Sequence, residues 1–423
     1  MSDPLGAADR ATIARAQMSF ILAILAGFKG AARPSWLSPG HTHPDGNLPS
    51  RVSDFNALPP QDIIEVIAVR GPLHTIDGWS YLSRSLSALL SGDPHAARHL
   101  AYYSELRAAL SILASEGIAV FDTINRVVDA GGNLQALTSR STHDMCWAAL
   151  EYWATLPDSL RTMLRAVKIN GVALMDSLEA YFPSPSAPSL GGRLIGEWGF
   201  DLQQGAADRD ERNHSSYQPN ELTPLHTSLV DDLDFVNAVW RSFEPNSWKL
   251  EPHLLRKLLE LEQATVGGAG LADRSEGYAR LDGRVTAVVT AGFISRSEDA
   301  ENHPLLVVAS DRTSPASPYS MIARAALLLR ISTSMVEANF ESVSVTPFVD
   351  LKSWWRNFGV NHGFWTPPIE PESMQDLWLE VDDALSNANA ARATHRHEWV
   401  GNLVGSSSRI AEAERIALWN ICR

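Results

Sequence analysis

Apolar residues recur at intervals of three and four along most of this chain, a spacing typical of helices that bury one face. The clearest example is the segment 95–115, HAARHLAYYSELRAALSILAS. Five large side chains fall on one face of that helix: Leu100, Tyr103, Leu106, Leu110 and Leu113. A second periodic segment, 79–90, precedes it and is closed by Gly92 and Pro94, so the two predict a helical hairpin. We therefore expect a mainly α-helical fold.

The same spacing predicts further helices at 8–28, 144–156, 159–182, 229–243, 252–263, 320–336 and over most of 374–422. Two apolar or β-branched runs, 284–291 and 305–309, are too short for periodicity to distinguish a strand from a buried helix. We predict a few short strands around 284–310. The aromatic segment 354–371, WWRNFGVNHGFWTPPIEP, is interrupted by glycines and prolines and predicts an ordered loop packed by its own rings.

Two breaks in the pattern divide the chain, whose 423 residues exceed the roughly 100 to 200 typical of one domain. The first is 33–60, rich in Pro, Ser, Gly and His. The second is PSPSAPSLGG at 183–192, followed by an irregular polar segment at 208–224. We predict an N-terminal helix with a Pro-rich excursion over 1–60, a helical bundle over 61–224 and a C-terminal helical module over 225–423.

The acidic charge balance makes some binding partners less favourable than others. Asp and Glu number 49 against 35 Lys and Arg, a net charge of −14, which disfavours stand-alone, nonspecific DNA binding. The two cysteines, Cys146 and Cys422, have no CxxC spacing and fit a reducing compartment better than a disulfide scaffold or zinc module. The apolar run 18–28 is shorter than the about 20 residues of a membrane span. We expect a cytoplasmic protein with no membrane segment.

The most informative polar cluster is RDERNHSSY at 209–217. Arg209, Asp210 and His214 space a guanidinium and an imidazole about one helical turn apart, a pairing that can hold a phosphate and move a proton. Arg212 and Asn213 repeat the pattern, with Tyr217 in the place of the histidine. The cluster therefore predicts a phosphate-directed site, with two overlapping versions of one motif.

With these residues and the YYSELRAAL helix, the chain resembles the HEPN superfamily of helical bundles in prokaryotic toxins, abortive-infection proteins and CRISPR effectors. The resemblance covers roughly residues 77 to 220 and implies metal-independent RNA cleavage by paired protomers, with no cofactor. It gives Arg209 the phosphate role, Asp210 the orienting role and His214 the proton-transfer role. In the second version Arg212 and Asn213 take those places. Tyr217, with a side-chain pKa near 10, would be a poor base.

The alternative interpretation of 209–217 is a solvated loop in which Asp208 or Asp210 caps a turn and Arg212 pairs with an acid. Five acidic residues against three arginines between 190 and 220 favour it.

Other clusters favour structural roles. HTHPD, with His41, His43 and Asp45, fits a Pro-rich loop better than a metal site. HRHEW at 395–399 fits a solvated helix, since residues two apart do not share a helix face. Arg324 and Arg330 stand in an apolar helix, so we predict acidic partners for them.

Our leading hypothesis is an RNA-directed, HEPN-like protein of a prokaryotic defence or toxin-type system, an active or degenerate endoribonuclease that binds RNA and pairs with a second copy or another protein. The alternative is a noncatalytic helical scaffold or adaptor subunit of an antiviral assembly. The acid excess and the tryptophan-rich C-terminal third motivate that alternative.

Overall fold

The computed structural model describes residues 4–31, 33–182, 190, 193–194, 196, 202–217, 227–266, 274–296, 302–313, 316–367 and 374–390. Within these ranges the fold is mainly α-helical, as the apolar spacing predicts. The break at 183–192 (Leu190 apart), the end of the polar segment at 218–224, the HRHEW cluster and Cys422 lie outside the described residues.

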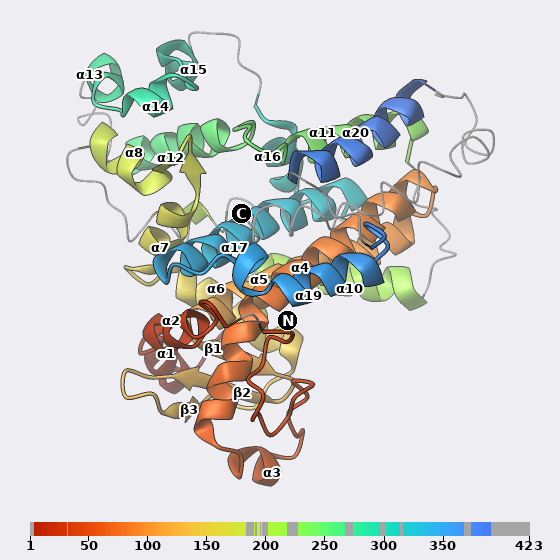
Figure 1. Cartoon of the computed structure of the whole chain (residues 1–423). Helices are drawn as coiled ribbons and strands as arrows, with labels where there is room; N and C mark the ends of the chain where they lie inside the picture. Colours follow the sequence, from red (N-terminus) through yellow and green to blue (C-terminus); the bar gives the residue numbers. More distant parts are fainter. Residues whose placement is uncertain are drawn as a thin grey trace.

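Three long helices form the centre of the molecule: α4 (Pro60–Leu90), α5 (Pro94–Ser115) and α17 (Pro318–Ser342). Figure 1 shows them crossing its middle, with the other helices arranged around them. The predicted hairpin is α4 and α5, and the Asp93 carboxylate caps the start of α5 by accepting from the Ala96 amide. α4 begins well before the predicted segment, at Pro60.

Glycines and serines allow α4 and α5 to approach closely. The Ser104 hydroxyl donates to the Gly78 carbonyl at 2.8 Å, and the Ser111 hydroxyl donates to the Gly71 carbonyl at 2.7 Å. A Cβ on Gly78 would lie 2.6 Å from a Leu329 methyl of α17, so that position accepts no larger residue without movement. All three central helices therefore meet at Gly78.

The other described helices surround this centre. In the first half of the chain they are α1 (Ala7–Ile13), α2 (Met18–Ala26), α3 (Val52–Asn56), α6 (Thr142–Ala154), α7 (Ser159–Ala166), α8 (Leu174–Tyr181) and α10 (Leu202–Tyr217). In the second half they are α11 (Leu229–Arg241), α12 (Glu251–Val266), α13 (Arg274–Ala279), α14 (Gly283–Thr286), α15 (Ala291–Ser295), α16 (Pro304–Ala309), α18 (Pro347–Asp350), α19 (Lys352–Asn361) and α20 (Met374–Ala390).

Short strands occur in two places. β1 (Ile118–Phe121), β2 (Ile124–Val128) and β3 (Leu134–Ala136) form an antiparallel meander in which Ile118 pairs with Val127. β4 (Lys168–Ile169) and β5 (Val172–Ala173) form a hairpin. Its two turn residues, Asn170 and Gly171, have φ of 47° and 78°, the positive values that a two-residue turn requires.

Several predicted boundaries are wrong. The strands expected around 284–310 are helices α14, α15 and α16, because these short apolar runs each bury one side of a helical turn. The expected helix 159–182 is divided by the β4–β5 hairpin, and the expected helix 8–28 is two helices. The start of the aromatic segment forms α19 instead of a loop, and the polar segment expected to be irregular forms α10 through Tyr217.

The division of the chain at residues 60 and 224 stays a prediction. α17, from the predicted C-terminal module, packs directly on α4 and α5 of the predicted bundle. The tryptophans described in that module are buried or half-buried, and Trp355 stacks on Trp365 with ring centroids 4.4 Å apart. Because these rings are covered and pack against one another, they form part of the core.

Arg324 has the acidic partner that the sequence predicts, and a second acidic residue lies beside it. Arg324 of α17 is fully buried and donates from Nε and Nη2 to the two carboxylate oxygens of Asp208 on α10, at 3.1 and 2.8 Å. Glu105 of α5 lies 3.4 Å from Arg324 Nε. One guanidinium thus joins three helices. Arg330 likewise pairs with buried Glu251 at 2.7 Å.

Two carboxylates around one guanidinium leave an excess negative charge. Burial, and then the charge of Asp208, raise the pKa of Glu105 well above its usual range. Burial raises the pKa of Asp208 as well, but Arg324 and the Gln204 amide stabilise its ionised form. We infer that Glu105 holds a proton at neutral pH and that Asp208 carries the charge.

This arrangement predicts opposite outcomes for the two acids. Arg324→Met leaves the buried Asp208 charge unpaired, and Asp208→Asn leaves Arg324 only the more distant carboxyl group of Glu105. Each should lower the free energy of unfolding, by up to about 3–5 kcal/mol in urea titrations. Glu105→Gln should leave it unchanged or raise it. The exposed pair Lys168–Glu341 is the control, and Glu341→Gln should change the free energy by less than about 1 kcal/mol.

The pH dependence has a definite sign. The folded state keeps a proton on Glu105 that the unfolded chain releases near its ordinary pKa of 4.5, so this group makes stability fall as the pH rises above that value. Glu105→Gln should remove that fall. A wild type whose stability rises through the same range relative to Glu105→Gln would show that Glu105 is ionised in the folded protein.

Candidate functional site

Of the six residues predicted for the site, Arg209 and Arg212 point from α10 toward α5 and α6. Arg209 Nη1 lies 2.6 Å from the Asp144 carboxylate at the start of α6, so its charge is already paired. The Arg212 guanidinium lies over two rings of α5, 5.3 Å from the centroid of Tyr102 and 5.4 Å from that of Tyr103. These two arginines therefore differ in what they can still bind.

The other four predicted residues lie nearer to solvent. Asp210, His214 and Tyr217 are exposed, Tyr217 to 79%, and Asn213 is half-buried. Residues five apart in a helix are separated by about 140° around its axis, so Arg209 and His214 leave α10 in different directions. The spacing that motivated the site does not place these two side chains together.

Arg212 makes no ion pair with any described residue. Its Nε hydrogen is buried without a hydrogen-bond acceptor among the described residues, and its guanidinium lies over the two tyrosine rings. A guanidinium held at a half-buried position without a carboxylate retains its donors for an anion. Arg212, and not Arg209, is the cation of this region that is suited to phosphate.

His99 of α5 is oriented toward α10. Its Nδ1 lies 2.7 Å from the Ser216 hydroxyl, and that hydroxyl donates its proton to the Arg212 carbonyl at 2.8 Å. Because Ser216 has only one proton to give, neutral His99 must donate from Nδ1. The lone pair of His99 is then on Nε2, where it can accept a proton.

His143 of α6 has the opposite tautomer. Its Nδ1 lies 2.8 Å from the Tyr102 hydroxyl, which also accepts from Trp147 Nε1 at 3.4 Å. The Tyr102 proton is thus directed at Nδ1, so neutral His143 carries its own proton on Nε2. One imidazole offers a lone pair and the other offers a proton.

Burial and the arginines keep both imidazoles neutral. Burial, then the charge of Arg212, lower the pKa of His99. Burial, then Arg212 and Arg209, lower the pKa of His143, while Asp144 opposes the shift. Burial raises the pKa of Tyr102, which therefore keeps its proton.

Tyr103 lies between the two imidazoles. Its ring centroid is 5.1 Å from that of His99 and 6.4 Å from that of His143, and it stacks on Tyr81 of α4 at 5.4 Å. We call Arg212, His99, His143, Tyr102 and Tyr103 the α5–α6–α10 cluster. It combines a cation, an acceptor, a donor, the buried ring of Tyr102 and the half-buried ring of Tyr103.

Two contacts fix α10 against the helices that carry these side chains. A Cβ on Gly205 would lie 2.5 Å from the Trp147 ring of α6, so only glycine allows this approach. Buried Arg98 of α5 donates to the Glu211 carboxylate at 3.0 Å and to the Ser215 hydroxyl at 3.3 Å. The cluster is thus held by the packing around it.

Sequence patterns did not indicate His99, His143 and Tyr102 as site residues, because they come from two other helices. One signal was available. The positions 95, 99, 103 and 107 hold His, His, Tyr and Arg at intervals of four, a polar stripe along one face of the helix. A stripe of this kind can indicate a face that serves something other than the core.

The other sequence clusters have structural roles where they are described. His41 Nδ1 accepts from the His43 amide in the loop and its Nε2 contacts the Asp62 carbonyl at the start of α4, so both ring nitrogens are used. Asp45 accepts from the Asn47 amide and side chain. Among the described residues, no group of three or more His, Cys, Asp or Glu side chains is placed to hold a metal ion.

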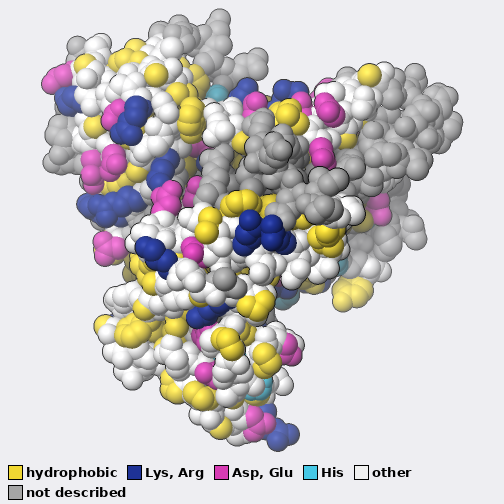
Figure 2. Space-filling model, viewed as in Figure 1, with side chains coloured by type: hydrophobic (Ala, Val, Ile, Leu, Met, Phe, Trp, Pro, Cys, Tyr) yellow, Lys and Arg dark blue, Asp and Glu magenta, His cyan; other side chains and the backbone are white. Residues whose placement is uncertain are grey.

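One face of the described surface has no feature that favours general binding to phosphates. On the face shown in Figure 2, the described basic and acidic side chains are interspersed and form no broad basic patch. None of the described helices combines the length and apolar character needed to cross a bilayer.

Comparison with protein-family models, curated proteins and solved structures finds no match to this chain. What the α5–α6–α10 cluster can do must therefore be derived from its own residues.

The electrostatic coupling within the cluster can be measured. Arg212→Gln removes a positive charge that disfavours both imidazolium forms, so the pKa values of His99 and His143 should rise. Titration of the ring resonances by NMR measures both. His253 on α12, whose pKa is lowered to about 4 by other groups, is the internal control and should not change. Unchanged values at His99 and His143 would mean that Arg212 does not face them in solution.

Proposed function

We propose that this chain is an RNA-directed protein of the prokaryotic defence or toxin type, and that it cleaves single-stranded RNA without a metal at the α5–α6–α10 cluster. The proposal combines the HEPN resemblance of the α10 motif with one observation. An arginine that has no carboxylate partner among the described residues lies beside two imidazoles of opposite tautomer. Cleavage through the ribose 2′-hydroxyl needs a cation for the phosphate, a base and an acid, and His143 would supply the acid once it is protonated.

In the proposed reaction, His99 Nε2 takes the proton of a ribose 2′-hydroxyl and the 2′ oxygen attacks the adjacent phosphorus. The bond from phosphorus to the 5′ oxygen breaks, and that oxygen takes a proton from His143. The products are a 2′,3′-cyclic phosphate and a 5′-hydroxyl. Arg212 donates to the nonbridging oxygens, where negative charge accumulates in the transition state.

His143 can act as the acid only as an imidazolium. Arg212 and Arg209 disfavour that form in the free protein. A bound phosphodiester carries a negative charge that offsets this repulsion, so substrate binding raises the pKa of His143 and favours its protonation. The requirement for a bound phosphate links proton supply to the presence of substrate.

The aromatic rings support a single-stranded substrate. Tyr103 is half-buried and stacks on Tyr81, which gives a platform on which an unpaired base can lie. A duplex keeps its bases stacked on one another and would not reach these rings. The net charge of −14 makes binding depend on this local geometry instead of a general attraction to phosphates.

The scaffold alternative rests partly on the tryptophan-rich C-terminal third. The tryptophans described there are buried or half-buried within the fold and supply no observation in its favour.

The test is cleavage of a single-stranded RNA that carries a fluorophore and a quencher, in the presence of EDTA. His99→Gln and His143→Gln should each lower the rate by about 10²–10⁴-fold. Arg212→Gln should lower it by about 10²–10³-fold. A substrate with 2′-deoxyribose at every position should not be cleaved, because it lacks the attacking oxygen.

The matched controls come from the same helix. Neither Arg209→Gln nor His214→Gln should lower the rate, because Arg209 is paired with Asp144 and its charge disfavours the His143 imidazolium, and because His214 is exposed. Loss of activity in these two variants with normal rates in His99→Gln and His143→Gln would place the site on the outer face of α10. RNA binding without cleavage by the wild type would contradict the catalytic roles and favour an RNA-binding adaptor.

A further inference from the structure

A pocket of about 520 Å³ lies between α4 and the Pro-rich excursion that precedes it. One wall comes from α4, with Arg107 of α5 beside it, and the facing wall comes from 35–37 and 44–47 of the excursion. Figure 1 shows this excursion, in red-orange, beside α4. The pocket shares no residue with the α5–α6–α10 cluster, and the proposed function does not use it.

The excursion is fixed to the rest of the fold, so its wall of the pocket has a defined position. The Ser38 amide and hydroxyl both donate to the Glu65 carboxylate of α4, at 2.6 and 2.8 Å. The Trp36 ring packs edge to face against Phe28 and Trp354, with centroids 5.7 and 4.9 Å away. The apolar wall that Trp36 provides is therefore supported from behind.

Arg70 of α4 lines the pocket and makes no ion pair with a described residue. Its guanidinium lies over the Phe121 ring at 4.5 Å, and its Nη2 donates to the Gly46 carbonyl at 3.5 Å. Burial, and then the charge of Arg107, lower the pKa of Arg70 to about 10, while the charge of Asp77 opposes the shift. Arg70 is therefore charged at neutral pH and keeps donors for an anion.

His74 follows Arg70 by four residues on α4, so the two side chains are neighbours. His74 is only 7% exposed, and its Nδ1 accepts from Arg107 Nη1 at 3.0 Å. Burial, and then the charges of Arg107 and Arg70, lower the pKa of His74 well below its usual range, so the neutral ring carries its proton on Nε2. That N–H donates to no described residue, although a donor on so buried a ring is normally matched by an acceptor.

The remaining charged side chains of the described lining limit the charge of a ligand. Arg107 Nη1, which donates to His74, also lies 3.5 Å from the Asp77 carboxylate. Asp45 lines the excursion side and is exposed, as Asp77 is on α4. A second negative charge on a ligand would be repelled by these two carboxylates. The arrangement therefore favours a single anionic group, placed at Arg70 and His74.

Apolar side chains form much of the rest of the lining: Trp36, Leu37, Val66, Val69 and Leu73. A cavity of about 150 Å³ holds one benzene molecule. At about 520 Å³, this pocket has room for an anionic group and an apolar chain of roughly ten carbon atoms. The ligand that fits is thus charged at one end and apolar along its length.

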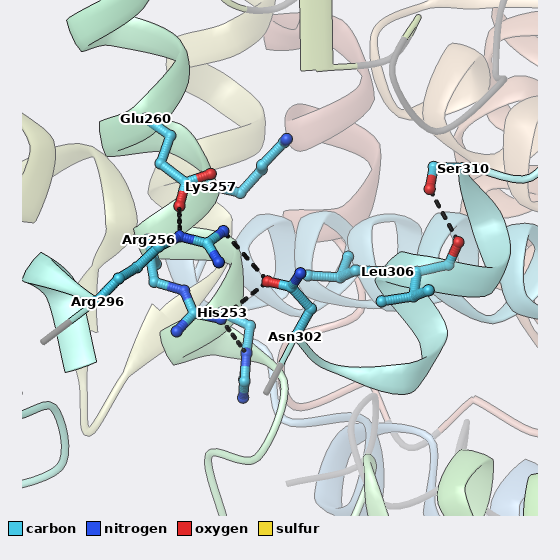
Figure 3. A pocket seen from close by; sticks show the side chains of 9 residues that line it. His253, Arg256, Lys257, Glu260, Arg296, Asn302, Leu306 and Ser310 are labelled. Atoms are coloured by element: carbon cyan, nitrogen blue, oxygen red, sulfur yellow. Dashed lines mark hydrogen bonds and ion pairs between the residues drawn. The ribbon is translucent and has the colours of Figure 1, made fainter. Parts of the chain in front are cut away.

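A different pocket provides a contrast. Figure 3 shows Arg256 and Arg296 there, and both donate to the Asn302 side-chain oxygen at 3.2 Å. Arg296 Nε also pairs with Glu260 at 2.7 Å. Each of these arginines already donates to a protein acceptor, so Arg296 is a suitable control for Arg70.

We propose that the pocket at Arg70 binds the ionised form of a carboxylic acid with an apolar chain. One carboxylate oxygen accepts from Arg70 and the other accepts from His74 Nε2, while the chain lies against Trp36, Leu37 and Val66. A carboxylate presents two acceptors and one charge, which matches these two donors. A phosphomonoester carries close to two charges at neutral pH and would bring the second toward the acids of the lining.

The experiment titrates octanoate into the whole protein by isothermal titration calorimetry at neutral pH and constant ionic strength. Octanamide has the same chain without the charge and should bind roughly tenfold more weakly or worse. Acetate should also bind roughly tenfold more weakly or worse, because it lacks the chain. Arg70→Gln should reduce the affinity for octanoate by roughly tenfold and change that for octanamide little. Arg296→Gln should leave octanoate binding unchanged.

The comparison of octanoate with octanamide and acetate uses the wild type, so it does not depend on how well a variant folds. Octanamide, acetate or inorganic phosphate that binds as tightly as octanoate would overturn the proposal, and so would the absence of saturable binding at millimolar octanoate. If Arg70 serves only to pack on Phe121, Arg70→Gln should lower stability and leave the ratio of octanoate to octanamide affinities unchanged. That result would also overturn it.

Discussion

The buried ion pair between Arg324 and Asp208 determines where α10 lies. A guanidinium in the middle of an apolar helix is very costly unless a carboxylate reaches it. Here the carboxylate comes from a residue 116 positions earlier in the chain, and Glu105 approaches the same guanidinium from α5. Three helices that are distant in sequence are thereby brought to one point, and the requirement is electrostatic because one charge must meet another.

The positions of the other α10 side chains follow from that contact. Once Asp208 points inward, the helical repeat turns Arg212 and Ser215 toward α5 and turns Asp210 and His214 toward solvent. Arg212 reaches the tyrosines, and Ser216 orients His99. An ion pair in the core thus selects which of two overlapping motifs faces the neighbouring helices. It selects the one in which tyrosine replaced histidine, while histidines from α5 and α6 provide the imidazoles.

Sequence patterns predicted those parts of the fold that depend on apolar periodicity. The α4–α5 hairpin, the helix around Arg324 and the need for an acidic partner there are of this kind. The sequence did not predict α10 because the described buried side chains of this helix are polar. A spacing of apolar residues therefore does not mark it as a helix. The β4–β5 hairpin could have been predicted, because the Asn170–Gly171 pair is typical of a two-residue turn. His99 and His143 could not be paired from sequence, because their proximity depends on how three helices dock.

The polar character of α10 has a consequence for motion. Among its described side chains the buried ones belong to Gln204, Asp208 and Ser215, with Gly205 at the contact with Trp147. Because the Arg324–Asp208 pair is buried, added salt screens it little. Separation of α10 would also uncover the Trp147 ring and the rings of Tyr102 and Tyr103 that its residues cover. The arginine-bearing helix is therefore held in place by buried charge, and its position should be insensitive to the ionic strength around the protein.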